Sequence, residues 1–291
     1  MTGIILVDKE QGWTSSDVVA KLRGVLRERR IGHAGTLDPM ATGVLVVMVG
    51  RGTRASEYLM RHEKKYRAIF RPGIVTDTQD TTGNILAENP CSITREQLEN
   101  AAKAFLGDIE QIPPMYSAIK IGGQKLYDMA RRGEEVERPA RKIHISSITV
   151  LGSEGSDWIL DVECSFGTYI RTLCSDLGDK LGCGGCMAGL RRLSSGCYHA
   201  EDAYSVQQIV DAANRGEAEK LLLPLDSVFP EYREFHPNAW EEERILHGNP
   251  IIVRLQDGGY RVYSGTGEFL MLGRAEKGIL KMEKCFFEVK Q

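Results

Sequence analysis

The sequence of 291 residues lacks any long hydrophobic run. Its opening apolar run is only Ile4 to Val7, the first charged residue is Asp8, and no segment approaches the roughly 20 apolar residues that a membrane-spanning helix needs. We therefore expect a cytoplasmic protein without a membrane partner.

Cysteines are too few and too scattered for a disulfide framework. There are seven, an odd number, spread from Cys91 to Cys285, whereas small secreted domains concentrate theirs. Reduced thiols are therefore expected. Cys183 and Cys186 have the spacing of half a zinc site, but the sequence holds no second close pair. A glycine-rich turn with structural thiols is the preferred interpretation, and no metal is expected.

The sequence also lacks internal repeats, low-complexity tracts and a large net charge, which is -3 at pH 7. The charge is unevenly distributed: residues 1–72 hold 13 Lys and Arg against 7 Asp and Glu, and residues 201–243 hold 3 against 11. The N-terminal part can therefore present a phosphate-binding face although the whole chain is mildly acidic. Two unconnected solvated faces are the alternative interpretation.

What the sequence does contain is a mixture of helical and strand patterns. With 42% hydrophobic residues, the chain can bury a large core and is long enough for one large domain and a small one. Ser15 or Ser16 is predicted to cap a helix, and a capping box of Thr94 and Gln97 begins another. The other predicted helices cover 54–61, 124–132, 169–181 and 205–214, and the predicted strands cover 43–50, 65–75, 143–151 and 158–165. Helices mixed irregularly with strands favour an α+β domain over a regular βαβ series.

The pattern changes after Pro230. Short predicted strands, separated by glycine turns, cover 251–255, 260–264, 268–273 and 278–289. They indicate a small all-β domain of about sixty residues, with the domain boundary in the segment 223–230.

The most informative segment for function is the octapeptide Gly32-His-Ala-Gly-Thr-Leu-Asp-Pro39. It places the carboxylate of Asp38 in a loop with two glycines, between the first helix and the strand 43–50, where a ligand can reach it. A turn in which Asp38 caps nearby backbone amides is the alternative. Four other residues have ordinary structural interpretations when each is considered alone. His33 is then a loop histidine, Tyr66 and Tyr169 are core aromatics, and Arg171 is a surface charge.

A second motif is Gly50-Arg-Gly-Thr-Arg-Ala55, which lies between a predicted strand and a predicted helix and matches the dinucleotide-binding fingerprint. Taken alone, it indicates an oxidoreductase. The following helix is short, however, no βαβ series follows, and the acidic residue that binds the ribose has no clear place. A plain turn from strand to helix is therefore the preferred interpretation.

Further motifs run through nearly the whole chain. Together with the octapeptide they are Asp8-Lys9, Gly12-Trp-Thr-Ser-Ser16, Ala41-Thr-Gly43, Lys65-Tyr66, Thr76-Asp-Thr78 with Asp80, Gln111-Ile-Pro-Pro-Met-Tyr-Ser-Ala-Ile-Lys120, Gly167-Thr-Tyr-Ile-Arg171 and Leu190-Arg-Arg-Leu193. In this order they resemble the TruB family of tRNA pseudouridine synthases. One departure is Glu10, because the family usually has proline after the lysine of the first motif.

The resemblance implies a pseudouridine synthase fold, in which helices flank a mixed, largely antiparallel sheet, followed by a small all-β PUA-like domain. It implies a catalytic domain over residues 1–229, with an RNA-contacting insertion at about 121–142, and a PUA-like RNA-binding domain over 230–291. A monomer that uses no cofactor is expected.

The resemblance also implies a reaction and its residues. The uridine at position 55, in the T-loop of tRNA, has its glycosidic bond moved from N1 to C5 of the uracil. By analogy Asp38 is the nucleophile, Tyr66 stacks on the flipped base, and Arg171 pairs with Asp38. The residues that line the substrate site by the same analogy are His33, Tyr169, Leu190 and Lys9. Burial raises the pKa of a carboxyl group and an adjacent cation lowers it, so Arg171 is expected to keep Asp38 charged.

The partner that the resemblance implies is the T-arm of tRNA. The basic residues that we expect to contact its phosphates are Arg23, Arg27, Arg29, Arg30, Lys64 and Arg67, with Lys125, Arg131, Arg132, Arg141 and Lys142 from the insertion. A tRNA-folding chaperone, which binds the same arm without needing chemistry, is the first alternative function. The nucleotide-dependent oxidoreductase indicated by residues 50–55 is the second.

Overall fold

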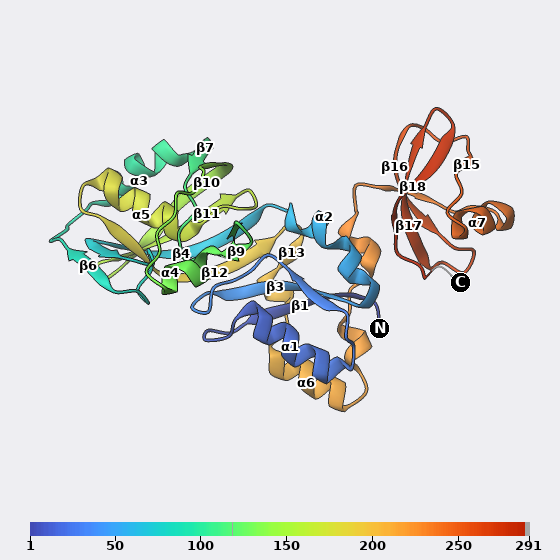
Figure 1. Ribbon diagram of the computed structural model, residues 1–291, viewed down its shortest axis with the longest axis horizontal. Coiled ribbons are helices and arrows are strands. Elements are labelled where there is room, and N and C mark those ends of the chain that lie inside the picture. Colours follow the sequence, from blue (N-terminus) through green and yellow to red (C-terminus); the bar gives the residue numbers. More distant parts are fainter. Residues whose placement is uncertain (118, 289–291) are drawn as a thin grey trace.

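The computed structural model describes residues 1–117 and 119–288. Its main feature is a nine-stranded sheet in the order β1-β3-β12-β4-β11-β10-β7, with β2 paired to β3 and β13 paired to β12 (Figure 1). Among these pairs only β3 and β12 run parallel. The predicted mixed, largely antiparallel sheet is therefore confirmed. Its strands are β1 (Gly3–Lys9), β2 (Ile31–Ala34), β3 (Thr42–Val49), β4 (Lys64–Pro72), β7 (Gly107–Gln111), β10 (Arg141–Glu154), β11 (Asp157–Cys164), β12 (Gly185–Ser195) and β13 (Tyr198–His199).

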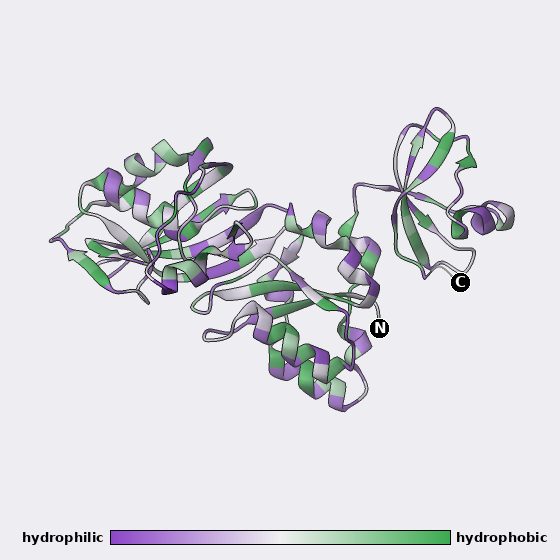
Figure 2. Cartoon of the chain, in the orientation of Figure 1, coloured by the Kyte–Doolittle hydropathy of each residue, from purple (hydrophilic) through white to green (hydrophobic). Residues whose placement is uncertain are grey.

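Helices flank this sheet at both ends. The helix α1 (Ser15–Leu26) packs with α6 (Val206–Asn214) beside β1, and α3 (Arg95–Ala102) packs with α5 (Ile170–Leu181) near β10 (Figure 1). Their apolar residues, green in Figure 2, join those of the sheet in one continuous core. The combination of helices and a mixed sheet confirms the predicted α+β class.

Some local details differ from the sequence-based prediction. The N-cap of α1 is Thr14, whose hydroxyl accepts a hydrogen bond from the Asp17 amide, and not Ser15 or Ser16. In the large sheet, β1, β2, β7, β12 and β13 were not predicted, and the first three residues of the octapeptide, 32–34, belong to β2. The predicted helix 54–61 is a 3-10 turn, η1 (Gly50–Ala55), followed by the short helix α2 (Ser56–Met60).

The C-terminal part is built on a five-stranded sheet in the order β14-β16-β17-β18-β15. Its strands are β14 (Arg233–Phe235), β15 (Ile251–Ile252), β16 (Gly258–Tyr263), β17 (Phe269–Glu276) and β18 (Ile279–Cys285). Beside β15 lies a short helix that we did not predict, α7 (Ala239–Leu246).

Phe229 joins the C-terminal sheet to the rest of the molecule. Its fully buried ring lies with its centroid 5.1 Å from that of Tyr58 on α2, 6.0 Å from that of Phe269 on β17 and 5.7 Å from that of Phe286. Apolar residues of β1 and β3 belong to the same buried cluster. The two parts of the chain therefore share an apolar core at the junction.

Two hairpins lie outside the large sheet: β5 (Ile74–Thr76) with β6 (Ile85–Glu88), and β8 (Lys120–Ile121) with β9 (Gln124–Lys125). The second hairpin and the helix α4 (Leu126–Arg131) fall within the predicted insertion 121–142. The remaining 3-10 turns are η2 (Lys103–Phe105), η3 (Ala200–Asp202), η4 (Ala218–Leu221) and η5 (Leu225–Val228). Over residues 1–117 and 119–288, no helix has the length and apolar character needed to cross a membrane.

Candidate active site

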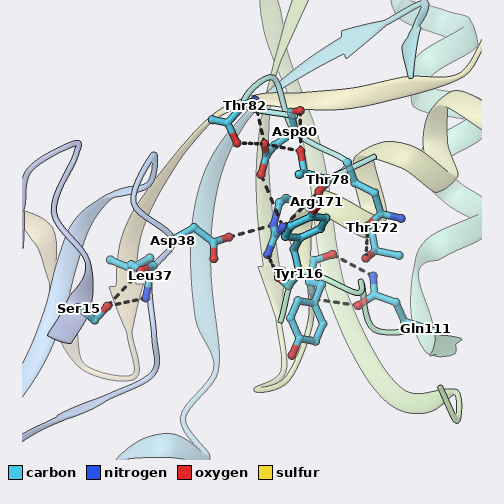
Figure 3. Close-up of polar contacts among 12 residues, drawn as sticks. Ser15, Leu37, Asp38, Thr78, Asp80, Thr82, Gln111, Tyr116, Arg171 and Thr172 are labelled. Carbon is cyan, nitrogen blue, oxygen red and sulfur yellow. Dashed lines mark hydrogen bonds and ion pairs between the residues drawn. The ribbon is translucent and has the colours of Figure 1, made fainter. Parts of the chain in front are cut away.

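Asp38 lies in the loop between β2 and β3. Its neighbour Leu37 is buried, and the Ser15 hydroxyl accepts from the Leu37 amide at 2.9 Å and donates to the Leu37 carbonyl at 3.2 Å. The Ala41 amide donates to the Asp38 carbonyl at 3.0 Å and closes a turn. The loop backbone is therefore tied to the start of α1, and the Asp38 carboxylate points away from it toward Arg171 (Figure 3).

The carboxylate of Asp38 contacts Arg171 in the first turn of α5. The Arg171 Nε lies 3.0 Å from Asp38 Oδ2, and its Nη1 and Nη2 donate to the carbonyls of Thr78 at 3.2 Å and Tyr116 at 2.8 Å. The Arg171 side chain is 7% exposed and that of Asp38 is 37% exposed, so the cation is fixed while the carboxylate keeps an accessible side. No backbone amide of the described residues donates to this carboxylate, in contrast to the capping-turn alternative.

The start of α5 is itself held in place. The buried side chain of Gln111, at the end of β7, donates to the Tyr169 carbonyl at 3.0 Å and accepts from the Tyr169 amide at 2.8 Å. One residue beyond Arg171, the Thr172 hydroxyl donates to Gln79 Oε1 at 2.9 Å. These bonds orient the first turn of the helix and with it the guanidinium of Arg171.

Asp80 is a second carboxylate beside Arg171, to which the sequence analysis gave no role. It is 4% exposed, and its Oδ2 lies 3.6 Å from Arg171 Nη1. Its Oδ1 accepts from the Thr78 hydroxyl at 2.9 Å, the Thr82 amide at 2.9 Å and the Thr82 hydroxyl at 2.5 Å (Figure 3). These three donors supply the hydrogen bonds that a buried charged carboxylate needs. Arg171 is therefore shared between an accessible carboxylate and an enclosed one.

The pKa of Asp38 is raised above its ordinary value. Burial is the largest cause, and the charge of Asp80 acts in the same direction, whereas Arg171 and Lys9 lower the pKa. Arg171 thus opposes the effect of burial without overcoming it. The nearby Lys9 is fully buried, its Nζ donates to the carbonyls of Trp13 at 2.7 Å, Glu10 at 3.0 Å and Pro39 at 3.4 Å, and burial lowers its pKa to about 8.

Tyr66 lies on β4 directly opposite Arg192 of β12. The two residues are 9% and 1% exposed, and the Arg192 guanidinium donates to the carbonyls of Val44 at 2.7 Å and Gly35 at 3.0 Å. Burial raises the pKa of Tyr66, and a hydrogen bond with Arg192 opposes that rise. Tyr66 is therefore a neutral phenol near neutrality, and Arg192 connects its strand to the loop that carries Asp38.

The other predicted site residues lie on the surrounding elements. His33 is on β2, where burial lowers its pKa and its Nδ1 is buried with no hydrogen-bond partner among the described residues. Tyr169 immediately precedes α5, and Leu190 on β12 packs against the core that includes Tyr66. In the described part of the chain, none of these three forms a hydrogen bond or an ion pair with Asp38.

Two motifs of the sequence suggest other functions, namely the dinucleotide-like residues 50–55 and the zinc-like pair Cys183 and Cys186. In the structure both have structural roles. A Cβ on Gly50 would lie 2.2 Å from the Met1 carbonyl oxygen, and one on Gly52 would lie 2.6 Å from that of Gly3. Glycines in residues 50–55 therefore allow η1 to pack against the N-terminal strand. Cys183 contacts Cys91, whereas Cys186 is fully buried on β12. Among the described residues, no group of three or more His, Cys, Asp or Glu side chains has an arrangement that could hold a metal ion.

Comparison with known proteins identifies the family of this chain. A family model described as "TruB family pseudouridylate synthase (N terminal domain)" matches residues 23–170, and one described as "tRNA pseudouridylate synthase B C-terminal domain" matches residues 171–229. The chain belongs to the TruB family. Proteins named tRNA pseudouridine synthase B from Citrobacter koseri and from Clostridium perfringens (strain ATCC 13124) are each 39% identical to it. The alignments cover 97% and 99% of this chain and 95% and 100% of the relatives.

Solved structures share the fold of this TruB-family chain. One is described as a Cbf5-Nop10-Gar1 complex, with a TM-score of 0.75 and 26% identity over 99% of this chain and 85% of the matched chain. Another, described as an H/ACA RNP bound to a substrate RNA containing 2'-deoxyuridine, has a TM-score of 0.74 at 23% identity over 99% and 86%. The pseudouridine synthase fold expected from the sequence is therefore confirmed.

Two buried residues of this TruB-family site, Asp80 and Arg192, lie within the family motifs but received no role from the sequence. Asp80 stands among threonines in a turn-like segment, and Arg192 stands next to Arg191, whose side chain instead pairs with Asp8 at 2.9 Å and is 40% exposed. Which of two adjacent arginines faces inward depends on strand register. The adjacent arginines Arg191 and Arg192 could have indicated that one of them is buried, because side chains alternate between the two faces of a strand. This indication requires β12 to be recognised as a strand.

The basic residues expected to meet phosphate fall into two groups. Lys64 is buried, and its Nζ donates to the carbonyls of Met60 and His62, so our expectation that it contacts phosphate is wrong. Exposed positions are Arg23, Arg27, Arg29, Arg30, Arg67, Arg131, Arg132, Arg141 and Lys142. Of these, Arg30 pairs with Glu288 at 3.2 Å, Arg67 with Asp161 at 2.8 Å and Arg132 with Glu134 at 2.7 Å. Arg23 donates to the Ile31 carbonyl at 2.9 Å. The side chain of Lys125 lies outside the described part of the structure.

Proposed function

We propose that this TruB-family protein isomerises uridine to pseudouridine at position 55 in the T-loop of tRNA, with Asp38 as the nucleophile. The observation that carries the proposal is the Asp38–Arg171 contact of 3.0 Å, in which the arginine is enclosed and the carboxylate is still accessible. A nucleophilic carboxylate needs access to its target and a fixed partner that favours its charged form.

The reaction that we propose conserves all atoms of the nucleoside. The bond between uracil N1 and the sugar C1′ breaks, a bond between C5 and C1′ forms, the proton on C5 leaves, and N1 gains a proton. Asp38 acts at the sugar while the bond to N1 is broken. No oxidant or reductant is needed, because the product is an isomer of the substrate.

The target uridine must leave its stack before Asp38 can reach it. Flipping costs roughly a few kcal/mol, and stacking on an aromatic ring returns roughly 1–3 kcal/mol per base. Tyr66 is suited to this role because its phenol is neutral, it is close enough to Asp38 for the carboxylate charge to raise its pKa, and 9% of the residue is exposed. The uracil would contact the exposed part of the ring, with Tyr169, His33, Leu190 and Lys9 as further lining of the site.

The T-arm would be held through its phosphates. Arg141 and Lys142 are exposed on β10, which follows the hairpin and helix of residues 120–131 in the sequence, and Arg27, Arg29 and Arg30 are exposed after α1. Each phosphate that a cation neutralises releases counterions, so the affinity for tRNA should fall steeply with salt. A tRNA affinity independent of salt would contradict this part of the proposal.

Substitution of the nucleophile tests the proposal directly. Asp38→Asn should abolish tritium release from tRNA that contains 5-tritiated uridine, while tRNA binding on filters stays close to wild type. The matched control is Asp157→Asn, which removes the charge of a carboxylate that is 16% exposed and paired with Arg71 at 2.7 Å. We expect it to stay within about twofold of the wild-type rate. Undiminished release from Asp38→Asn would remove Asp38 from its role.

Mapping the product tests the position and separates catalysis from RNA chaperoning. Carbodiimide treatment followed by primer extension should give one stop, at the T-loop uridine, in tRNA treated with the wild-type protein. It should give none in tRNA treated with Asp38→Asn. A protein that only remodels tRNA would leave no stop, and a stop elsewhere would contradict the proposed position.

A further inference from the structure

Two cysteines that are 92 positions apart in the sequence meet at the end of the molecule opposite the C-terminal sheet. Cys91 follows β6 and precedes α3, and Cys183 follows the last turn of α5. Figure 1 places these elements at the same end of the large sheet. Both are free thiols, and their sulfur atoms lie 2.6 Å apart.

Hydrogen bonds of the backbone and of the Asn89 side chain hold the two cysteine segments together independently of the sulfur atoms. The Asn89 side chain donates to the Cys183 carbonyl at 2.9 Å, and the Asn89 amide donates to the Gly73 carbonyl at 2.7 Å. The Gly73 amide in turn donates to the Gly184 carbonyl at 2.9 Å. The juxtaposition of the thiols is therefore built into the fold, because each segment is bonded to the other or to a shared strand end.

A pocket gives small molecules access to this thiol pair. It is open, has a volume of about 590 Å³, and is lined by both cysteines together with residues of α3 and Lys180 of α5. Cys91 is partly exposed and Cys183 is 8% exposed. Cys174 and Cys186 are also free thiols, but they are buried and do not line the pocket.

We propose that Cys91 and Cys183 form a reversible intramolecular disulfide by exchange with a low-molecular-weight disulfide that enters this pocket. The Cys91 thiolate attacks one sulfur of the small disulfide, giving a mixed disulfide and releasing one small thiol. Cys183 then loses its proton and attacks the Cys91 sulfur, which forms the protein disulfide and releases the second small thiol. The two cysteines are oxidised by two electrons, and the small disulfide is reduced by two.

The disulfide would connect the segment before α3 to the end of the helix whose first turn carries Arg171. Burial and the contact with Cys183 raise the pKa of Cys91, so the first step is slow, and the second step is favoured because the partner is already in contact. Disulfides of this kind are unusual in reducing compartments and are typically transient or redox-sensing. The pair is therefore a candidate modification site and not a permanent structural bond.

The test uses the full chain and oxidised glutathione as the probe, in a mildly alkaline buffer. After incubation, free thiols are blocked and peptides are mapped without reduction. We expect a linked peptide pair that contains Cys91 and Cys183, the return of both thiols on reduction, and a rise of the melting temperature by roughly 5–10 °C in the oxidised protein. Full alkylation of both cysteines after the incubation would overturn the proposal.

Single substitutions separate the two steps. Cys91→Ser should leave Cys183 alkylatable, and Cys183→Ser should accumulate a glutathione mixed disulfide at Cys91. The matched control is Cys197→Ser, which removes an exposed thiol and should form the Cys91–Cys183 link at the wild-type rate. A wild-type protein that stops at the mixed disulfide would contradict the proposal, because Cys183 would then not act as the resolving thiol.

Discussion

Arg171→Lys is the most direct test of how the Arg171 guanidinium acts on Asp38. The native guanidinium uses three nitrogen atoms at once, with Nε toward Asp38 at 3.0 Å and Nη1 and Nη2 toward the carbonyls of Thr78 and Tyr116 at 3.2 Å and 2.8 Å. The single ammonium of lysine keeps the charge but cannot serve all three directions from one position. We expect the lysine ammonium to stay with the carbonyls of Thr78 and Tyr116, so that Asp38 loses its fixed partner.

The expected magnitude follows from the contact that is lost. A hydrogen bond to a charged group contributes about 1.5–3 kcal/mol, and each 1.36 kcal/mol in an activation barrier is a factor of ten in rate. If the orientation of Asp38 is needed only as the glycosidic bond breaks, Arg171→Lys should lower the single-turnover rate by roughly 10–150-fold. Because the charge is retained, the affinity for tRNA should change little.

Arg171→Met extends the same argument. Removing one partner of a buried ion pair costs about 3–5 kcal/mol, so this variant should lose thermal stability as well as activity. Loss of the cation also raises the pKa of Asp38 further, because Arg171 is the largest of the effects that lower it. The acidic limb of kcat/KM should therefore move to higher pH in Arg171→Met than in Arg171→Lys.

The assay is single-turnover tritium release with enzyme in excess over tRNA, accompanied by filter binding and thermal melting. Arg71→Lys is the matched control, because Arg71 forms a two-point pair with Asp157, at 2.8 Å and 2.7 Å, with a side chain that is 40% exposed. It should change the rate by no more than about twofold. If Arg171→Lys released tritium as fast as wild type, with tRNA binding and melting unchanged, the three-point contact that fixes Arg171 beside Asp38 would be irrelevant to catalysis.

Three further outcomes follow from the structure. Asp80→Asn should move the acidic limb of kcat/KM to lower pH, because the Asp80 charge raises the pKa of Asp38, and a shift to higher pH would refute that coupling. Gly43→Ala and Gly12→Ala should each lose about 1–3 kcal/mol of stability to backbone strain, since their φ angles are +99° and +88°. In chemical denaturation Gly43→Ala should lose about 1–3 kcal/mol more than Gly12→Ala. A Cβ at position 43 would lie 2.2 Å from a β12 carbonyl oxygen, whereas one at position 12 meets open space. Equal losses in the two variants would contradict this contact. Phe229→Ala should cost about 3–5 kcal/mol and speed proteolysis at residues 223–230, whereas Phe229→Leu should be milder, and unchanged proteolysis in both would show that this ring does not hold the C-terminal sheet in place.

Local sequence patterns predicted the helices better than the strands. The apolar spacing of α1 and the capping box at Thr94 both appear in the structure, because both signals are contained within one turn or one face of a helix. The strand β12 was missed. Its two glycines and adjacent arginines break the alternation that marks a strand, and it is placed by partners on either side that are distant in the sequence.

The same distinction applies to the candidate site. The octapeptide and the family motifs indicated Asp38, Tyr66 and Arg171, because residue identity and order along the chain carry that information. They could not indicate that Arg171 is shared with Asp80 or that Arg192 bonds the loop of Asp38. Those contacts depend on which strands are neighbours and on their register, and neither can be read from a single sequence.

The arrangement of charge around Asp38 explains why one arginine is not sufficient. Arg171 is divided between two carboxylates, so its pull on Asp38 is limited, and the pKa of Asp38 stays raised. A base that closes over the site removes more water and raises that pKa again. Lys9 supplies a second cation, fixed to the carbonyl of Pro39 next to Asp38, and its pKa of about 8 keeps most of its charge at neutral pH. The two cations favour the charged carboxylate together, and above about pH 8 the contribution of Lys9 is lost as its ammonium deprotonates.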